Sequence, residues 1–323
     1  MADRKGAWRN RLRQAQRLRG VLALVAVIAL WCVWAPRDAD GNRLWLTPSL
    51  MKDIFFEQAI FGLLAAGMTL VILTGGIDLS VGAVLGLSAV SFSALLIWRE
   101  WHPAFAILAT LGIGALAGAV NGALVARFRM QPFAATLAMM VVARGVAKWV
   151  SHNEKVQSAE ANPPIFDTLA GSPLTLVLLM LAVFVVLGVI VSRTQFGRYL
   201  YGIGGNEEAV RLSGVSVQRY TMLAYIVCAL TAAMAGMCDA ARQTLGDPEA
   251  GMTYELDAIA AVVIGGTSLR GGQGGIPLTL LGLMIIGIVD KLLSMHGQDL
   301  SVRLMAKGLI IVVAVLIQGQ REA

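Results

Sequence analysis

The sequence predicts an all-α polytopic membrane protein with about ten transmembrane helices and glycine-rich broken segments. Of its 323 residues, 57% are hydrophobic and only 14% are charged, whereas a soluble domain typically carries about 25% charged residues. Apolar runs recur along the whole length, and they approach the ~17–20 residues that a helix needs to cross about 30 Å of hydrocarbon. The short alternating segments typical of a transmembrane β-barrel are absent from the sequence.

The apolar runs define the predicted transmembrane segments. In chain order they are residues 20–35, 55–74, 80–98, 103–126, 133–150, 173–192, 220–238, 256–265, 276–290 and 301–317. The eighth and ninth are short, and the glycine-rich sequence GGTSLRGGQGG separates them. We therefore predict one transmembrane domain over residues 20–318, with a basic tail at 1–19 and a short second tail at 319–323.

The distribution of basic residues orients these segments. A cluster of bases precedes the first apolar run, opposed only by Asp3: Arg4, Lys5, Arg9, Arg11, Arg13, Arg17 and Arg19. Because basic residues are retained on the cytoplasmic side of a membrane, this tail predicts a cytoplasmic N-terminus. Ten segments then make the C-terminus and residues 193–219 cytoplasmic, and that side holds about twice as many bases as the outer side. The net charge of +6 thus indicates membrane orientation, and we expect no nucleic-acid partner.

Signals of catalysis and of cofactor binding are missing from the sequence. It contains no G-x-x-x-x-G-K-[ST] motif, so this chain cannot itself be an ATPase of that class. The cysteines and histidines show neither a C-x-x-C pair nor metal-ligand spacing: Cys32, Cys228, Cys238, His102, His152 and His296. Paired carboxylates or a nucleophile motif cannot be placed on facing helices. We therefore predict a non-enzymatic protein without a metal, a disulfide or a cofactor.

A polar break interrupts the apolar pattern in LTGGIDLSVGAVLGL, where Gly75 and Gly76 precede Asp78. A backbone break in hydrocarbon leaves N–H and C=O groups unpaired unless protein or water covers them. Asp78 can be the N-cap of the following helix, satisfying free N–H groups with its side chain. It can also line a transport route, since acids within a membrane are candidates for function. The two interpretations are compatible.

A similar break occurs in VIGGTSLRGGQGG, where Gly265 and Gly266 match Gly75 and Gly76 at a constant offset along the chain. Paired breaks in two halves of a transporter are a typical mark of a transport site. The orientation predicted above is the same for both segments, so we treat them as similar breaks rather than as an inverted repeat.

A run of glycines at four-residue spacing occurs in GIGALAGAVNG: Gly114, Gly118 and Gly122. One face of this helix therefore lacks side chains, which favours close helix packing. Asn121 lies beside that face, where it can make an interhelical hydrogen bond or contact a ligand.

The most informative polar segment precedes the seventh apolar run. Within GGNEEAVRLSG, Asn206 can cap a short helix whose first turn carries Glu207 and Glu208. Arg211 follows near its end, and Gly214 can adopt the left-handed conformation that stops a helix. A helix of two turns is not stable alone. It needs a surface from this protein or from a cytoplasmic partner, unless it is simply a solvated surface helix.

Several segments together resemble a known family. AAGMTLVILTGGIDLSVGAVLGL, MQPFAATLAMMVVARG, GGNEEAVRLSGVSVQRYTMLAYIVCALTAAMAG and ELDAIAAVVIGGTSLRGGQGG look like the membrane subunits of bacterial ABC sugar importers. The group is that of the ribose, xylose, arabinose and galactose permeases, and the closest likeness is to galactofuranose importer permeases. The resemblance covers residues 55–318, in order and at family-like spacing.

The resemblance implies the ABC importer permease fold and a set of partners in the bacterial inner membrane. These are a second permease subunit (an identical or a related chain), cytoplasmic ABC ATPase subunits, a periplasmic sugar-binding protein and a sugar, expected to be a monosaccharide. Residues 206–214 correspond to the coupling helix, which sits in a groove of the ATPase. Asp78, Ser80 and Asn121 are the candidate pathway residues, because sugar hydroxyls pair with such groups. The alternative is a proton-coupled secondary transporter with Asp78 as the protonated group; a channel is a third possibility.

Overall fold

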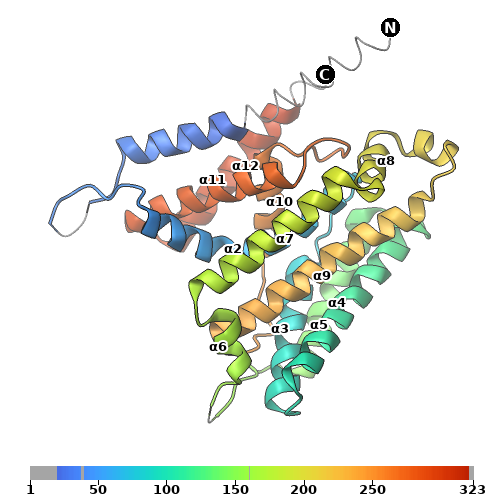
Figure 1. The fold of residues 1–323 in the computed structure, drawn as a ribbon, viewed down its shortest axis with the longest axis horizontal. Helices are drawn as coiled ribbons and strands as arrows, with labels where there is room; N and C mark the ends of the chain where they lie inside the picture. The colour runs from blue at the N-terminus through green and yellow to red at the C-terminus, as the bar shows by residue number, and fades with distance from the viewer. Residues whose placement is uncertain (1–19, 38–39, 160, 320–323) are drawn as a thin grey trace, which may run out of the picture.

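The computed structural model describes residues 20–37, 40–159 and 161–319, and this part of the chain is helical, with only isolated β-bridges between extended residues. The all-α fold class is therefore confirmed (Figure 1). The predicted basic tail 1–19 and residues 320–323 of the second tail lie outside the described residues.

Each predicted transmembrane segment coincides with a helix. The helices are Gly20–Val33, α2 Pro48–Leu73, α3 Val81–Ile97, α4 Pro103–Ala126, α5 Pro132–Val150, α6 Pro164–Ala170, α7 Pro173–Arg193, α8 Gln195–Leu212, α9 Val217–Gln243, α10 Tyr254–Gly265, α11 Ile276–Met295 and α12 Leu300–Gly319. Six of the described helices are long and apolar enough to cross a membrane, and Gly20–Val33 and α3 are shorter apolar helices. The count of ten spans is therefore approximate.

The differences from the predicted bounds have local causes. The predicted segment 55–74 begins earlier, at Pro48, because Thr47 caps α2 by accepting a hydrogen bond from the Leu50 N–H. The first turns of α2 carry Lys52 and Asp53. Because these residues are charged, the apolar run used to predict the helix begins only after them. Helix α6 and the part of α8 that precedes Asn206 were not predicted, whereas the rest of α8 coincides with the short helix expected at 206–214.

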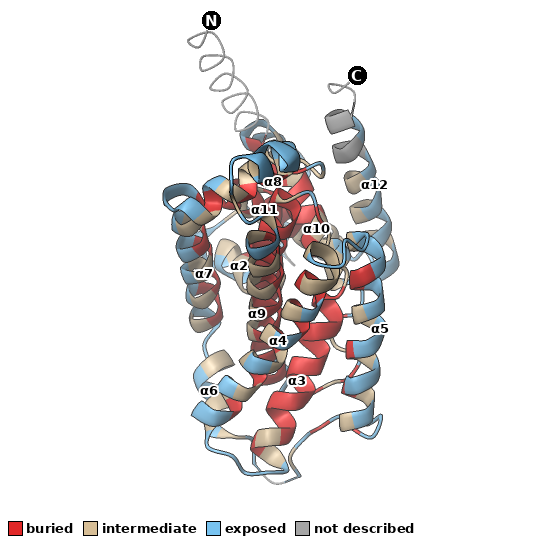
Figure 2. Ribbon diagram, turned by 90° about the vertical axis from the view of Figure 1, so that its right-hand side faces the viewer, coloured by how far each residue is buried: buried red, intermediate tan, exposed pale blue. Residues whose placement is uncertain are grey.

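The centre of the bundle is formed by α2, α3 and α9. Nearly all of α3 is buried, as is most of α2 and α9, whereas α5 and α7 expose one face each (Figure 2). A helix that is apolar on all sides is typical of a position inside a bundle. The break after α2 therefore lies at the end of a central helix rather than at the periphery.

Small residues bring α9 to backbone distance from its neighbours. A Cβ atom on Gly118 of α4 would lie 2.5 Å from the Tyr225 carbonyl oxygen, and one on Gly236 of α9 would lie 2.3 Å from the Leu85 carbonyl oxygen of α3. Gly114 and Gly122 of α4 approach α9 in the same way. The close packing predicted from the glycine spacing is confirmed.

Connecting segments gather at two opposite ends of the bundle. At one end lie residues 74–80, 127–131, 194–216 and 266–275, which contact one another or line one cavity. At the other end, residues 151–163 meet residues 244–253 through the β-bridge between Val156 and Gly246. The first end is called the α8 end below.

Candidate coupling helix and helix breaks

The first break separates α2 from α3. Gly75 takes a positive φ of 81°, a conformation that costs glycine little, and the chain then turns into α3. The N-cap of α3 is Ser80. The expectation that Asp78 is the N-cap is therefore wrong by two residues. Asp78 Oδ1 nevertheless accepts the Ser80 N–H at 2.9 Å, because a short acidic side chain readily bonds to a backbone N–H two residues on.

The three predicted pathway residues form one buried polar cluster. Asp78 Oδ1 also accepts the Ser80 hydroxyl at 2.6 Å, and Asn121 Nδ2 donates to Ser80 Oγ at 2.9 Å and to Asp78 Oδ1 at 3.4 Å. All three residues are 0% exposed. Asp78 Oδ2, Asn121 Oδ1 and the Tyr225 hydroxyl have no hydrogen-bond partner in the described part of the chain. The cluster ties α4 to the start of α3, and its part in a pathway stays a prediction.

The second break separates α10 from α11 and lies against the first. α10 ends at Gly265, and Gly266 continues with a φ of 105°. The N–H of Gly272 donates to the carbonyl oxygen of Leu73, the last residue of α2, at 2.9 Å. The two glycine-rich breaks that the sequence pairs by similarity are therefore in direct contact.

The short helix over residues 206–214 forms as the sequence predicts. Asn206 has non-helical dihedrals (φ −165°, ψ 95°) inside α8 and divides it into two helices. Its Oδ1 accepts the Ala209 N–H at 2.9 Å, which is an N-cap bond. Gly214 has a φ of 80°, the left-handed stop. The predicted cap and stop are both confirmed, and the coupling role of this helix stays a prediction.

The 206–214 helix presents both charge and apolar surface. Glu208 accepts a hydrogen bond from Arg211, and this bond raises the pKa of the Arg211 guanidinium above its usual value. Leu212, on the last turn, is 78% exposed.

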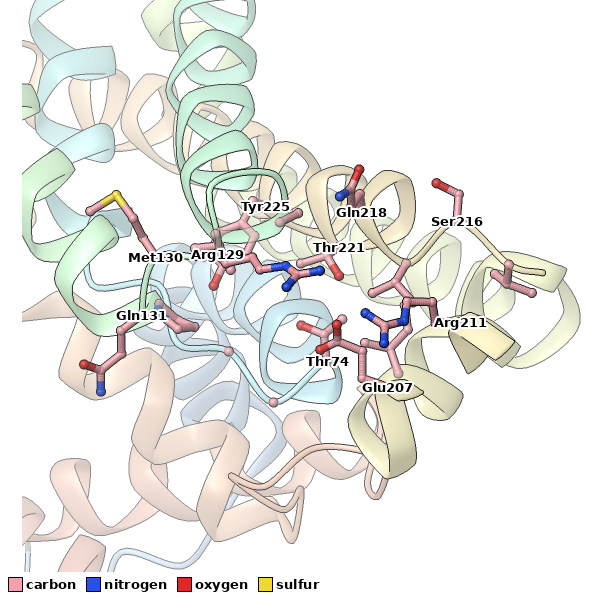
Figure 3. A pocket seen from close by; sticks show the side chains of 18 residues that line it. Thr74, Arg129, Met130, Gln131, Glu207, Arg211, Ser216, Gln218, Thr221 and Tyr225 are labelled. Atoms are coloured by element: carbon pink, nitrogen blue, oxygen red, sulfur yellow. The ribbon is translucent and has the colours of Figure 1, made fainter. Parts of the chain in front are cut away.

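A cavity of about 590 Å³ lies beneath this helix, between the first break, the turn 127–131 and the start of α9. Its polar lining comes from Thr74, Arg129, Glu207, Arg211, Thr221 and Tyr225, among others (Figure 3). Asp78, Ser80 and Asn121 do not line it. Tyr225 could not be recognised from the sequence because it lies in an apolar run. Arg129 could not be recognised either, because a basic residue in a turn indicates only on which side of the membrane the turn lies.

Two charged contacts toward the opposite end were also unforeseen. Arg144 of α5 donates through Nη1 to the carbonyl oxygens of Pro248 and Ala250 at 2.6 and 2.7 Å. Arg303 of α12 donates through both Nε and Nη2 to Asp290 of α11. The predicted spans contain Arg144 and Arg303 but give no sign of their partners. Arg144 thus ties α5 to the segment 244–253, and Arg303 ties α12 to α11.

Comparison with known proteins agrees with this architecture. The family model described as "Branched-chain amino acid transport system / permease component" matches residues 50–315. The ribose import permease protein RbsC of Escherichia coli K12 is 38% identical over 309 residues, which cover 94% of each chain. The fructose import permease protein FrcC of Rhizobium meliloti is 37% identical over 276 residues, 83% of this chain and 77% of the relative.

A third relative bears on the resemblance to galactofuranose permeases. The galactofuranose transporter permease protein YtfT of Escherichia coli K12 is 35% identical over 321 residues, 97% of this chain and 92% of the relative. No solved structure matches the chain. The matches run through both breaks and the 206–214 helix. The chain therefore belongs to the permease family of ABC importers, in the group that contains the sugar import permeases.

Proposed function

We propose that this chain is the membrane-spanning permease subunit of a bacterial ATP-binding-cassette importer and moves a monosaccharide into the cytoplasm. ATP hydrolysis takes place on a separate cytoplasmic subunit. The relatives named for ribose, fructose and galactofuranose support the class of substrate, because all three are monosaccharides. The chain itself does no covalent chemistry in this proposal; it alternates between conformations open to either side.

The observation that carries the proposal is the 206–214 helix. It is capped by Asn206, stopped by Gly214 and exposes Leu212, so it is a preformed helix with an uncovered apolar residue. We propose that it docks in the ATPase subunit, which makes the α8 end the cytoplasmic end and both termini cytoplasmic. The basic residues at this end, Arg129 and Arg211 among them, agree with that orientation.

The remaining partners follow from the same proposal. A second permease, identical or related, completes the pathway across the inner membrane, and a periplasmic sugar-binding protein delivers the sugar to the end that carries residues 151–163 and 244–253. The cluster of Asp78, Ser80 and Asn121 is proposed to set the start of α3 beside that pathway. The proton-coupled alternative requires protons to reach Asp78, whose side chain is fully buried.

The test is reconstitution of the permease in vesicles with its ATPase subunit and its sugar-binding protein. We expect uptake of a monosaccharide that requires ATP on the cytoplasmic side and the binding protein on the other. Ribose, fructose and galactofuranose are the first sugars to compare. The permease alone, given a proton gradient, is the control. Uptake by the permease alone would contradict the ABC mechanism, and ATP-driven uptake of a substrate other than a sugar would contradict the substrate class.

A further inference from the structure

A single glycine of α8 lies on the contact between the two helix breaks. Gly204 precedes the Asn206 kink by two residues. A Cβ atom there would lie 2.1 Å from the Leu73 carbonyl oxygen and 2.4 Å from the Gly272 nitrogen. These are the two atoms of the 2.9 Å hydrogen bond that joins the breaks. The backbone of α8 therefore packs directly onto that bond, and only glycine leaves room for it.

The contact is equally close when seen from the second break. A Cβ atom on Gly271 would lie 2.6 Å from the Gly75 nitrogen and 2.8 Å from the Gly204 Cα. Gly271 and Gly272 also have positive φ angles of 84° and 70°. We call Gly75, Gly204, Gly271 and Gly272 the glycine junction. Three chain segments meet there without an intervening side chain, so no rotamer change can absorb a displacement of one segment against another.

A second bond joins α8 to the same loop. The Tyr201 hydroxyl donates to the Gly274 carbonyl oxygen at 2.9 Å. Tyr201 and Gly204 are three residues apart and so lie on one face of α8. That face contacts the loop between α10 and α11 twice, through the Tyr201 hydroxyl and through the Gly204 backbone. The chain continues from Gly204 through the kink at Asn206 directly into Glu207, the first residue of the 206–214 helix after its cap.

We propose that Gly204 is a positioning residue for coupling: it transmits displacement of the 206–214 helix to both helix breaks at once. The proposal rests on the proposed docking of that helix in the ATPase. A pull on residues 206–214 moves Gly204, and the glycine junction passes the movement to the end of α2 and to the loop between α10 and α11. Gly204 touches neither the ATPase nor the sugar.

The neighbouring glycine provides a matched control. Gly204 and Gly205 are both helical glycines without a positive φ, so alanine suits either backbone. A Cβ atom on Gly205 would meet nothing within 4 Å. Gly204→Ala and Gly205→Ala therefore add the same methyl group, in one case into the junction and in the other into open space. Both changes alter helix propensity by the same amount. A difference in transport between the two variants is therefore due to the glycine junction.

The experiment compares both variants in the reconstituted complex with ATPase and binding protein. Membrane insertion, retention of the ATPase on purification, ATP hydrolysis and sugar uptake are each measured. We expect Gly204→Ala to insert, to retain the ATPase and to hydrolyse ATP, but to lose most of its sugar uptake per ATP hydrolysed. Gly205→Ala should match the wild type in all four. A wild-type ratio of uptake to hydrolysis in Gly204→Ala, or an equal loss in Gly205→Ala, would overturn the proposal.

A milder variant keeps the test decisive if Gly204→Ala fails to insert. Tyr201→Phe removes only the hydroxyl that bonds to Gly274, and we expect it to insert normally and to lower uptake per ATP partially. A wild-type ratio in Tyr201→Phe, together with failed insertion of Gly204→Ala, would overturn the proposal and leave Gly204 a packing residue. Failure of the proposed function looks different, because the wild-type permease would then not retain the ATPase at all.

Discussion

Asn121 of α4 donates a 2.9 Å hydrogen bond to the hydroxyl of Ser80, the N-cap of α3. The Ser80 hydroxyl in turn donates a hydrogen bond to Asp78 Oδ1, so a buried carboxylate anchors the bond between the two helices. Removing one partner of such a network leaves the others without partners, which costs more than the bond itself contributes. The cluster is therefore a specific point at which to separate structural from transport effects.

Asp78→Asn should leave assembly intact and change transport only modestly. The side-chain carbonyl oxygen of asparagine can accept both hydrogen bonds from Ser80, because asparagine, like aspartate, readily bonds to a backbone N–H two residues on. Asp78→Leu should damage both insertion and uptake, because the N–H and the hydroxyl of Ser80 then lose their acceptor. Uptake and retention of the ATPase are measured for both variants. Loss of uptake in Asp78→Asn with normal ATP hydrolysis would show that the charge serves transport, and a silent Asp78→Leu would contradict either role.

Gly214→Val should insert normally yet lose uptake, through weaker ATPase binding or through hydrolysis without transport. Gly214 has a φ of 80° and open space around it, so the effect is purely conformational, since a β-branched residue scarcely adopts positive φ. Arg211→Ala should do less, because an exposed ion pair contributes little. Sugar-stimulated ATP hydrolysis and uptake are compared for the two variants. Wild-type behaviour of Gly214→Val would show that this segment is only a solvated loop.

Single cysteines should label according to the proposed orientation. In a background without Cys32, Cys228 and Cys238, a cysteine at position 155 or 249 should react with an impermeant reagent from outside the cell. A cysteine at position 207 should react only after the membrane is opened. Lys155, Glu249 and Glu207 are exposed side chains, so burial does not limit labelling. Outside labelling at position 207 would overturn the orientation and the docking of the 206–214 helix together.

Arg144→Met should loosen the segment 244–253 at the end opposite α8. The guanidinium donates to two backbone carbonyl oxygens there, and each buried acceptor left unpaired costs about 1–3 kcal/mol. Lys148→Met, one turn along α5, removes only an exposed ion pair with Glu249 and should have little effect. Amide hydrogen exchange over 244–253 should rise in Arg144→Met alone. Equal exchange in both variants would contradict a clamp at Arg144.

Much of the fold can be predicted from the sequence because its signals are local. Length and hydropathy locate the helices, and side-chain chemistry within four residues predicts the Asn206 cap and the Gly214 stop. The contact between the breaks cannot be predicted in this way. It is a hydrogen bond between the backbone N–H of Gly272 and the backbone carbonyl oxygen of Leu73, and every residue except proline has both groups. The role of Gly204 cannot be predicted from the sequence either, because the sequence does not distinguish a glycine in close backbone contact from one in open space, such as Gly205.

Arginine partners were missed for a related reason. The sequence places Arg144 and Arg303 inside apolar segments, where a charge needs a partner, but the partner is chosen by tertiary contact. Arg303 pairs with a carboxylate, Asp290, whereas Arg144 pairs with backbone carbonyl oxygens, which every residue possesses. The need for a partner was predictable in both cases, and its identity in neither.

The glycine contacts of α9 determine how the bundle can move. At Gly118 and Gly236 the backbones of α4 and α3 touch α9, and a Cβ atom on Gly67 of α2 would lie 2.9 Å from the Cys228 Cα. Helices seated this closely cannot slide or bend against one another without collision, so α2, α3, α4 and α9 should turn as one rigid body. The proposed transport pathway would then open between these four helices and the helices around them, and the distance between two spin labels placed within the four should stay constant through the transport cycle.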